Sequence, residues 1–375
     1  MQSSAFRPVW SEIDLAAVRH NVAALCGLVQ PAQLLAVVKA DAYGHGAVPV
    51  ARAALEAGAA WLGVALVEEG VALRDAGIAA PLLVLSEPSP AAAGEVVARG
   101  LTPVVYTHHG IEALAKAVAD AGRGAPLPVH LKVDTGMHRV GCQVDEALPF
   151  VELITQVPEL SLEGVCTHFA VADEAEHPYT ARQRELFDGL LARLDARGLR
   201  PPLVHAANSA AAIAEAALRY DLVRIGIALY GIPPSAAPAD RLELRPALAL
   251  KAKVSFVKEL GAGERLSYGL RYELPQASRI ATVPVGYADG VPRNLGAVGG
   301  EVLIGGRRHP IAGTITMDQL MVDVGDATVE VGDEVVLLGA QGADEVTASE
   351  WAARLGTIPY EIVCQIGPRV PRRYR

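Results

Sequence analysis

The stretch LLAVVKADAYGHG, residues Leu34 to Gly46, decides the fold that we expect for this chain. Its first part, Leu34 to Val38, is apolar throughout, which is typical of a parallel strand buried on both faces. Lys39 follows at once, and a lysine at the end of a buried strand either reaches water or takes part in chemistry. The polar and turn-forming residues after it, Asp41 to Gly46, are suited to a loop that holds a ligand. This pattern alone leaves both a solvated strand end and a ligand site open.

Similar short apolar runs recur along the first part of the chain, and alanine-rich stretches with helical spacing separate most of them. About eight such runs occur, at 34–38, 61–66, 81–85, 101–106, 129–133, 162–167, 203–206 and 222–225. Strands that alternate with helices predict parallel βαβ units, and this number of units favours a closed barrel over an open sheet. No GxGxxG follows the first run, which argues against a dinucleotide-binding fold.

The composition and the expected secondary structure change after about residue 230. The stretch GIPPSAAP at 231–238 has the composition of a linker, and β-rich runs follow it at 248–257, 280–285, 301–304, 319–324 and 334–338. Helical spacing returns only near 349–355. We therefore predict an α/β fold in which an eight-stranded parallel β/α (TIM-type) barrel, residues 1–233, precedes a mainly β C-terminal domain, residues 234–375. The segment that ends near Trp10 is a candidate to pack with the second domain.

Composition narrows the class of function. The chain has 375 residues, is 51% hydrophobic and carries a net charge of −9 without a basic block, so we expect no nucleic-acid partner. The N-terminal residues MQSSAFRPVW lack a secretion signal, and no apolar run is long enough to span a membrane. The four cysteines form no CxxC pair and no zinc spacing, so we expect no metal, free thiols and a cytoplasmic location.

Several polar residues are predicted to follow barrel strands. In β/α barrels the active site lies at the C-terminal ends of the strands, often with a phosphate site after the seventh and eighth. A hydroxyl and backbone amides in these two loops therefore predict a phosphate site at Ser209, Gly226 and Ile227. Taken singly, His168 is more simply a core histidine and Arg224 a surface ion-pair partner. The complete set shares one face of the barrel and favours a ligand site: Lys39, His168, Asn208, Ser209, Arg224, Gly226 and Ile227.

The segment VVKADAYGHG at 37–46 resembles the pyridoxal-phosphate signature of the alanine racemases. HAANS at 205–209 and DLVRIGI at 221–227 are similar to the phosphate and pyridine segments of that family, and the resemblance extends over nearly the whole chain. It implies that Lys39 forms a Schiff base with pyridoxal 5'-phosphate, that Arg224 faces the pyridine nitrogen, and that His168 packs on the ring. The residues that it implies for the phosphate and its surroundings are Tyr43, Asn208, Ser209, Gly226, Ile227 and Tyr360.

Further segments extend this resemblance. HLKVDTGMHRVG at 130–141 implies that Arg139 contacts the cofactor and the substrate carboxylate, and that Lys132, often carbamylated in the family, supports it. LSYG at 266–269 implies that Tyr268 is a second base. VGYADG at 285–290 and TMDQ at 316–319 resemble segments that line the substrate's route and bind its carboxylate, through Tyr287, Met317 and Asp318.

The resemblance implies an isomerase that interconverts L-alanine and D-alanine for peptidoglycan. A free amino acid is too weak a carbon acid for any side chain, so the cofactor must delocalise the carbanion while Lys39 and Tyr268 each serve one face. It also implies a homodimer in which each site borrows Tyr268, Met317 and Asp318 from the partner. The alternatives are a racemase of broader specificity, for example for serine, a decarboxylase of basic amino acids, and a non-catalytic pyridoxal-phosphate carrier. A carrier would need no second domain.

Overall fold

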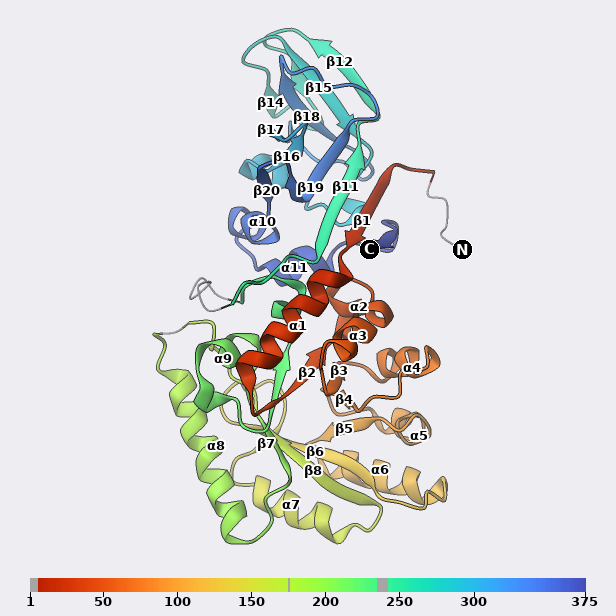
Figure 1. Cartoon of the computed structure of the whole chain (residues 1–375), viewed down its shortest axis with the longest axis vertical. Helices are drawn as coiled ribbons and strands as arrows, with labels where there is room; N and C mark the ends of the chain where they lie inside the picture. The colour runs from red at the N-terminus through yellow and green to blue at the C-terminus, as the bar shows by residue number, and fades with distance from the viewer. Residues whose placement is uncertain (1–5, 175, 235–241) are drawn as a thin grey trace. The chain divides into compact units, whose positions relative to one another are not determined.

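The computed structural model describes residues 6–174, 176–234 and 242–375 (Figure 1). The chain divides into two compact units. The first, here called the β unit, comprises Met1–Ala17, Tyr43–Gly46 and Arg245–Arg375. The second, here called the barrel unit, comprises Val18–Ala42 and Ala47–Leu244. The predicted linker at 231–238 lies outside the described residues from position 235 onward.

The barrel unit is built on parallel strands, as predicted. In spatial order they are β10 (Leu222–Ile225), β2 (Gln33–Val37), β3 (Trp61–Val64), β4 (Leu82–Val84), β5 (Thr102–Val105), β6 (Leu127–Asp134), β8 (Leu160–Cys166) and β9 (Leu203–His205). A short strand, β7 (Cys142–Gln143), pairs with β6. Two backbone hydrogen bonds join the ends of this order, from Asp221 to Val204 (3.0 Å) and from Arg224 to Ala207 (2.9 Å). The sheet is therefore nearly closed into a barrel.

Helices lie outside the ring of strands (Figure 1). They are α1 (Leu15–Val29), α3 (Ala47–Glu56), α4 (Val67–Asp75), α5 (Ala93–Ala98), α6 (His108–Asp120), α7 (Ala147–Gln156), α8 (Tyr179–Ala196) and α9 (Ser209–Ala214), with 3₁₀ turns η1 (Pro90–Ala92), η2 (Ala216–Leu218) and η3 (Ile227–Tyr230). In α7 the buried residues Ala147, Phe150, Val151 and Ile154 fall at helical spacing, so the helix presents one apolar stripe. The hydroxyl of Thr107 caps α6 by accepting a hydrogen bond from the Gly110 amide (2.9 Å).

The described part of the β unit contains three sheets. The largest has the order β17 (Arg307–Pro310), β16 (Glu301–Ile304), β19 (Glu334–Gln341), β11 (Leu248–Lys253), β1 (Val9–Ile13) and β21 (Arg372–Tyr374), with β20 (Asp344–Val346) paired to β19. A second sheet joins β12 (Phe256–Leu260), β15 (Ser278–Val283) and β18 (Leu320–Gly325), and β13 (Arg265–Leu266) pairs with β14 (Tyr272–Glu273). The helices are α10 (Ala348–Leu355) and α11 (Pro359–Cys364), with 3₁₀ turns η5 (Tyr287–Asp289) and η6 (Leu295–Val298).

One predicted strand of the β unit is divided in the structure. The apolar run at 248–257 forms β11 and β12, which belong to different sheets. The chain changes sheet at Val254 and Ser255, whose amides donate to the carbonyls of Asp333 (2.9 Å) and Thr282 (2.9 Å). The backbone amides at the change of sheet thus remain paired, and the hydrophobic pattern of the run continues through it without a break.

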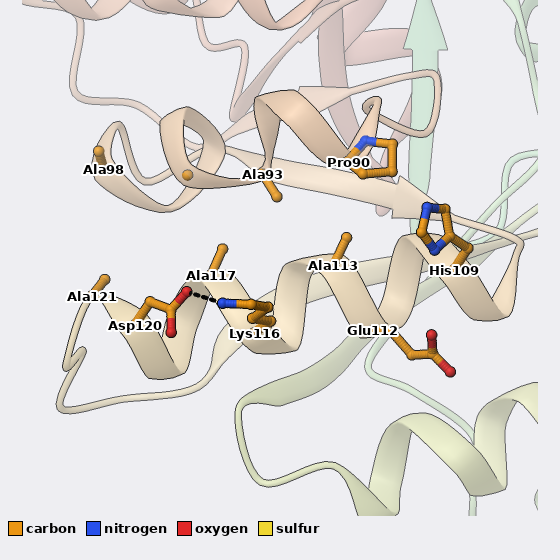
Figure 2. A pocket seen from close by; sticks show the side chains of 11 residues that line it. Pro90, Ala93, Ala98, His109, Glu112, Ala113, Lys116, Ala117, Asp120 and Ala121 are labelled. Atoms are coloured by element: carbon orange, nitrogen blue, oxygen red, sulfur yellow. Dashed lines mark hydrogen bonds and ion pairs between the residues drawn. The ribbon is translucent and has the colours of Figure 1, made fainter.

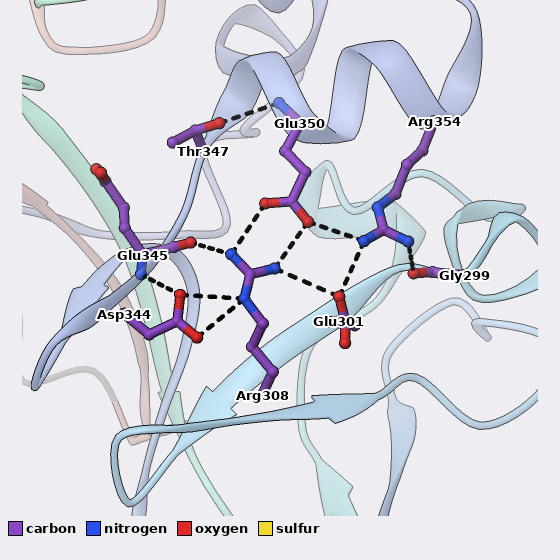
Figure 3. Close-up of polar contacts among 8 residues, drawn as sticks. All are labelled: Gly299, Glu301, Arg308, Asp344, Glu345, Thr347, Glu350 and Arg354. Atoms are coloured by element: carbon purple, nitrogen blue, oxygen red, sulfur yellow. Dashed lines mark hydrogen bonds and ion pairs between the residues drawn. The ribbon is translucent and has the colours of Figure 1, made fainter.

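Charged side chains tie the edge of the large sheet to α10 (Figure 3). Arg308 of β17 donates to both carboxylate oxygens of Glu350 (2.8 and 3.1 Å) and to Asp344 (3.0 Å). Arg354 donates to Glu350 (3.0 Å) and Glu301 (2.9 Å). Burial alone would raise the pKa of Glu350, but the two guanidinium groups outweigh it and the pKa is lowered. The network therefore contributes most when its carboxylates are ionised.

Among the helices in the described part of the chain, none is long and apolar enough to cross a membrane.

Candidate active site

Lys39 opens an unusual turn directly after β2. The backbone φ angles of Ala40, Asp41, Ala42 and Tyr43 are +51°, +52°, +55° and +53°, in the left-handed region that residues with a Cβ seldom occupy. Each such residue costs roughly 1–2 kcal/mol relative to the right-handed form. The surroundings hold the turn: the Ala40 amide donates to Glu69 (2.6 Å) and the Ala47 amide to Asp41 (2.7 Å). Strain of this kind is concentrated at functional sites, which favours the ligand-loop interpretation of this segment.

Arg224 of β10 is almost fully buried at the ends of three neighbouring strands. Its Nη2 atom donates to the carbonyls of Thr167 (2.8 Å) and Ala206 (2.8 Å) and to Nδ1 of His168 (3.0 Å). Its Nη1 atom donates to Nδ1 of His205 (2.7 Å). Burial lowers the pKa of Arg224, but an arginine stays protonated in proteins. The surface ion-pair interpretation of Arg224 is therefore wrong, and the guanidinium is a fixed buried cation.

The positive charge of Arg224 acts on both His168 and Lys132. Burial, followed by the charges of Arg224, Lys132, Arg139 and Lys39, holds the pKa of His168 well below its ordinary value, so its imidazole is neutral. Burial lowers the pKa of Lys132 to about 8, with Arg224, Arg139 and Lys39 acting in the same direction. Because these groups act on one another electrostatically, Lys39, Lys132, Arg139, His168 and Arg224 lie near one another in one cluster. The strand ends predicted this for Lys39, His168 and Arg224, whereas Lys132 and Arg139 were implied by the resemblance.

The loop that carries Arg139 is shaped by Asp134 at the end of β6. One oxygen of Asp134 accepts from the amides of Gly136 (2.9 Å) and His138 (3.0 Å), and the other contacts Nδ1 of His138 (3.1 Å). His138 itself has a φ angle of +54°. These contacts lower the pKa of Asp134 even though burial opposes the change. The loop conformation before Arg139 thus depends on one carboxylate.

The predicted phosphate residues of the barrel unit also meet. The Gly226 amide donates to Oγ of Ser209 across 2.9 Å, which places the ends of β9 and β10 side by side. Asn208 caps α9, because its side-chain oxygen accepts from the Ala211 amide (3.0 Å). Ile227 begins η3 and is buried. Asn208 therefore shapes the loop, whereas the Ser209 hydroxyl and the Gly226 amide meet at one point and are hydrogen-bonded to each other.

In the β unit, Tyr43 and Tyr360 lie in contact although more than three hundred positions separate them. Their ring centroids are 6.1 Å apart with an interplanar angle of 50°. Burial, then the neighbouring Tyr360 and Cys364, raises the pKa of Tyr43, so its phenol stays protonated and able to donate. Gly44 is required beside them, because a Cβ there would lie 2.5 Å from the Val363 carbonyl oxygen. The structure therefore joins two residues that the resemblance assigned to the phosphate.

The remaining predicted residues of the β unit are displayed on its surface. Tyr268 is 72% exposed on a tight turn in which the Leu270 amide donates to the Ser267 carbonyl (3.1 Å). Met317 is 51% exposed and Tyr287 41% exposed, and the amide of Tyr287 donates to the Thr316 carbonyl (3.0 Å). Arg369 donates to Asp318 across 2.7 Å. These side chains are therefore accessible on the surface of the β unit.

A groove elsewhere on the barrel unit involves none of these residues. It lies between α5 and α6 and is lined by five alanines, Pro90 and Gly94, with Lys116, Asp120, Glu112 and His109 along it (Figure 2). In the part of the chain that the structure describes, no group of three or more His, Cys, Asp or Glu side chains could hold a metal ion.

Several polar residues around the site received no role from the sequence. His130 and His205 are fully buried and hydrogen-bonded to each other (2.8 Å). Gln183 of α8 is fully buried and donates to the Thr135 hydroxyl (3.2 Å) and the His168 carbonyl (3.0 Å), so it links the ends of β6 and β8. For the two histidines the available signal was a polar residue inside a largely apolar strand, which does not reveal the partner, and for Gln183 on α8 there was no such signal.

Comparisons with known proteins agree with this geometry. The alanine racemase N-terminal domain family matches residues 13–234 and the alanine racemase C-terminal domain family matches residues 247–374. An alanine racemase of Symbiobacterium thermophilum is 50% identical over 375 residues, which cover 100% of this chain and 99% of that protein. The crystal structure of alanine racemase from D-cycloserine producing Streptomyces lavendulae has a TM-score of 0.93 and 42% identity, over 98% of this chain and 97% of that one.

A second solved structure, the Bacillus anthracis alanine racemase with bound L-Ala-P, has a TM-score of 0.91 and 40% identity, over 99% of this chain and 95% of that one. The fold and the cluster at the strand ends define a class of two-unit proteins in which a β/α barrel with a lysine after its first strand is joined to a β unit. Within that class, this chain belongs to the alanine racemase family.

Proposed function

We propose that this chain interconverts L-alanine and D-alanine with pyridoxal 5'-phosphate bound at Lys39, and that Tyr268 of a second copy completes each site. Its activity is that of an isomerase, in keeping with full-length alanine racemase relatives that are up to 50% identical. The observation that carries the assignment of the site is the cluster of cations at the ends of the barrel strands.

This cluster is suited to a ligand with several negative charges. The cationic groups that act on one another there are Lys39, Lys132, Arg139 and Arg224. Burial lowers the pKa of Lys132 to about 8, and the positive charges of Arg224, Arg139 and Lys39 repel its ammonium and act in the same direction. A phosphate and a substrate carboxylate would relieve that repulsion, so the residues present fit a phosphorylated cofactor and an amino acid.

The chain's own groups fit the parts of this cofactor. Lys39 offers a primary amine for its aldehyde. Ser209, Gly226 and Ile227 would offer donors for its phosphate, with the Gly226 amide exchanging its present acceptor, Oγ of Ser209, for the phosphate. We keep Tyr43 and Tyr360 as further proposed phosphate residues, as the resemblance implies. When bound, the cofactor supplies the delocalisation that makes the substrate Cα–H bond acidic. Arg224 would lie at the ring nitrogen, where it can donate a hydrogen bond without giving up its proton. We infer that this limits side reactions such as transamination.

His168 and Lys132 complete the proposed site. His168 accepts from Arg224 at Nδ1, so its neutral ring carries its proton on Nε2 and can donate from there. Lys132 with a pKa of about 8 has a substantial neutral fraction in weakly basic solution. A neutral amine can attack CO₂, forming an N–C bond and releasing one proton to water, and the resulting carbamate would offer Arg139 an anionic partner.

The second base is proposed to come from another copy of this chain. Tyr268, Met317 and Tyr287 are 72%, 51% and 41% exposed, and a partner would cover them. A symmetric dimer is the commonest oligomer, and it would give two equivalent sites. We further propose that the enzyme works in the cytoplasm and supplies D-alanine for peptidoglycan.

Chiral analysis tests the proposed activity. The purified protein is incubated with a panel of L-amino acids, and each enantiomer is quantified over time. We expect D-alanine to form at the highest rate and to approach equal amounts of both enantiomers, with Lys39→Ala as the inactive control. Failure to form any D-amino acid in the presence of added cofactor would overturn the proposal. A faster reaction with serine than with alanine would instead identify a racemase of other specificity.

A further inference from the structure

Glu163 of β8 lies at the far end of a chain of hydrogen bonds that begins at Arg224. Nη1 of Arg224 lies 2.7 Å from Nδ1 of His205, and Nε2 of His205 lies 2.8 Å from Nδ1 of His130. Nε2 of His130 then lies 3.3 Å from Oε2 of Glu163. Both imidazoles are fully buried, whereas the Glu163 side chain keeps 30% of its surface exposed. This series of hydrogen bonds thus joins a buried cation to a partly solvated carboxylate.

The guanidinium of Arg224 fixes the donor and the acceptor of each hydrogen bond in this series. A guanidinium can only donate, so Nδ1 of His205 must accept. Burial lowers the pKa of His205 and of His130, which makes both rings neutral, with one N–H each. His205 therefore carries its proton on Nε2 and donates to Nδ1 of His130. His130 in turn carries its proton on Nε2 and donates to Glu163.

The local backbone is adapted to this arrangement. The pairing of β6 with β8 shifts register next to His130: Val129 pairs with Leu162 and His130 with Gly164, which leaves Glu163 as the extra residue of the bulge. A bulge re-aims side chains and is common beside active sites. Gly164 provides room, because a Cβ there would lie 2.6 Å from Nδ1 of His130. Both features bring the imidazole of His130 and the carboxylate of Glu163 into contact.

We propose that Glu163 is a positioning residue that acts on Arg224 through His130 and His205. Its carboxylate holds both imidazoles in the tautomer that turns a lone pair toward the guanidinium, and it balances the buried cation from a distance. Hydrogen bonds in such a chain polarise one another, so the carboxylate at one end strengthens acceptance at the other. The inference rests on the proposed role of Arg224 and adds to the site a residue on the opposite side of the histidine pair.

Nitrogen NMR tests the tautomers directly. The full-length protein is produced with ¹⁵N-labelled histidine and used as purified. The ring-nitrogen signals of His130 and His205 are assigned by their loss in His130→Gln and His205→Gln. We expect an unprotonated Nδ1 and a protonated Nε2 for both residues. Glu163→Gln should shift the ring nitrogens of His130 and, less strongly, those of His205. A matched control is Glu152→Gln, which removes a carboxylate that pairs with Arg197 on the surface of the same unit.

Kinetics give the second readout. Glu163→Gln should lower kcat for alanine by about two- to tenfold, the range expected for one weakened hydrogen bond, and leave KM unchanged. Glu163→Asp, which keeps the charge, should lose less. A proton on Nδ1 of either histidine would overturn the proposal, as would a Glu163→Gln protein with wild-type nitrogen shifts. If the protein racemises no amino acid, the proposed function fails while the NMR result still decides whether this chain of hydrogen bonds exists.

Discussion

Arg224 donates a 2.7 Å hydrogen bond to His205, so a buried guanidinium is held by a neutral imidazole and not by a carboxylate. Its other terminal nitrogen serves His168 and two backbone carbonyls. A cation held in this way can donate to a ligand, and the carboxylate that we propose balances it, that of Glu163, lies beyond two imidazoles. This arrangement leads to the first prediction.

Replacing Arg224 should impair racemisation and release by-products. Arg224→Lys keeps a charge but loses the planar fork that serves His205 and His168 together, and removal of a preorganised donor typically costs about 10²–10³ in kcat. Arg224→Glu would place a carboxyl group that can give its proton to the ring nitrogen, so pyruvate from transamination should accumulate. The measurement is a coupled assay for pyruvate beside the chiral assay, with Arg184→Glu on the surface as the control. A normal rate without pyruvate in both Arg224 variants would count against the role.

Tyr268→Phe should remove one of two bases. A general acid–base group typically contributes about 10² to 10⁴ in rate, so both directions should slow by at least the lower figure. Because each base serves one face, the substrate isotope effect should rise more for one enantiomer of deuterated alanine than for the other. The matched control is Tyr272→Phe, whose hydroxyl donates instead to Asp323 (3.0 Å). Equal isotope effects for both enantiomers would indicate a single base.

Lys132 should make stability depend on pH in a defined direction. Its pKa falls from 10.5 to about 8 in the folded protein, mainly through burial, so between these values the unfolded chain binds more protons and stability rises with pH. Below pH 8 the folded protein carries an unfavourable charge worth about 3 kcal/mol, since one pKa unit corresponds to about 1.4 kcal/mol. Lys132→Met should therefore be the more stable protein near pH 7, and its advantage should disappear near pH 10.

Denaturant titrations in CO₂-free buffer at several pH values measure this difference. The matched control is Lys116→Met, which alters an exposed lysine on α6 that pairs with Asp120. Its free energy of unfolding should differ from that of the wild type by a constant amount. An equally constant difference for Lys132→Met would show that the amine is not desolvated as described.

The shared site predicts recovery of activity in mixed dimers. Lys39→Ala and Tyr268→Phe proteins, each nearly inactive, are partly unfolded together in equal amounts and refolded. About half of the dimers should then be mixed by random pairing, and each should have one intact site of its two, which gives about a quarter of wild-type activity. If mass spectrometry shows mixed dimers but activity stays at the level of the separate variants, each chain builds its own site.

Much of this architecture could be predicted from the sequence because it depends on local pattern. The apolar runs that became β2, β3 and β4 are buried on both faces, and such strands show as uninterrupted runs. The ends of the predicted strands place Lys39, His168 and Arg224 on one face of the barrel, which needs only the order of the apolar runs along the chain. The division of the run at 248–257 into β11 and β12 was missed, because a change of sheet leaves the hydrophobic pattern unaltered.

The contacts around Arg224 could not be predicted in the same way. His130 and His205 are separated by 75 positions, and only the pairing of β6 and β9 with β8 brings them together. Glu163 faces His130 because of a bulge, which strict alternation of side chains would not produce. The left-handed turn after Lys39 contains no glycine before Gly44, so composition gave no signal for it. The segment was recognised by resemblance and not by conformation.

Mapping the lysine that carries the cofactor tests the central claim most directly. The purified protein, loaded with pyridoxal 5'-phosphate, is reduced with borohydride and digested, and the labelled peptide is identified by mass spectrometry. The cluster contains two lysines, Lys39 and Lys132, so the experiment distinguishes between real alternatives. Our account predicts the label on Lys39 in the wild type and in Lys132→Met, and no label in Lys39→Ala. A label on Lys132, or on any lysine outside the barrel strand ends, would contradict it.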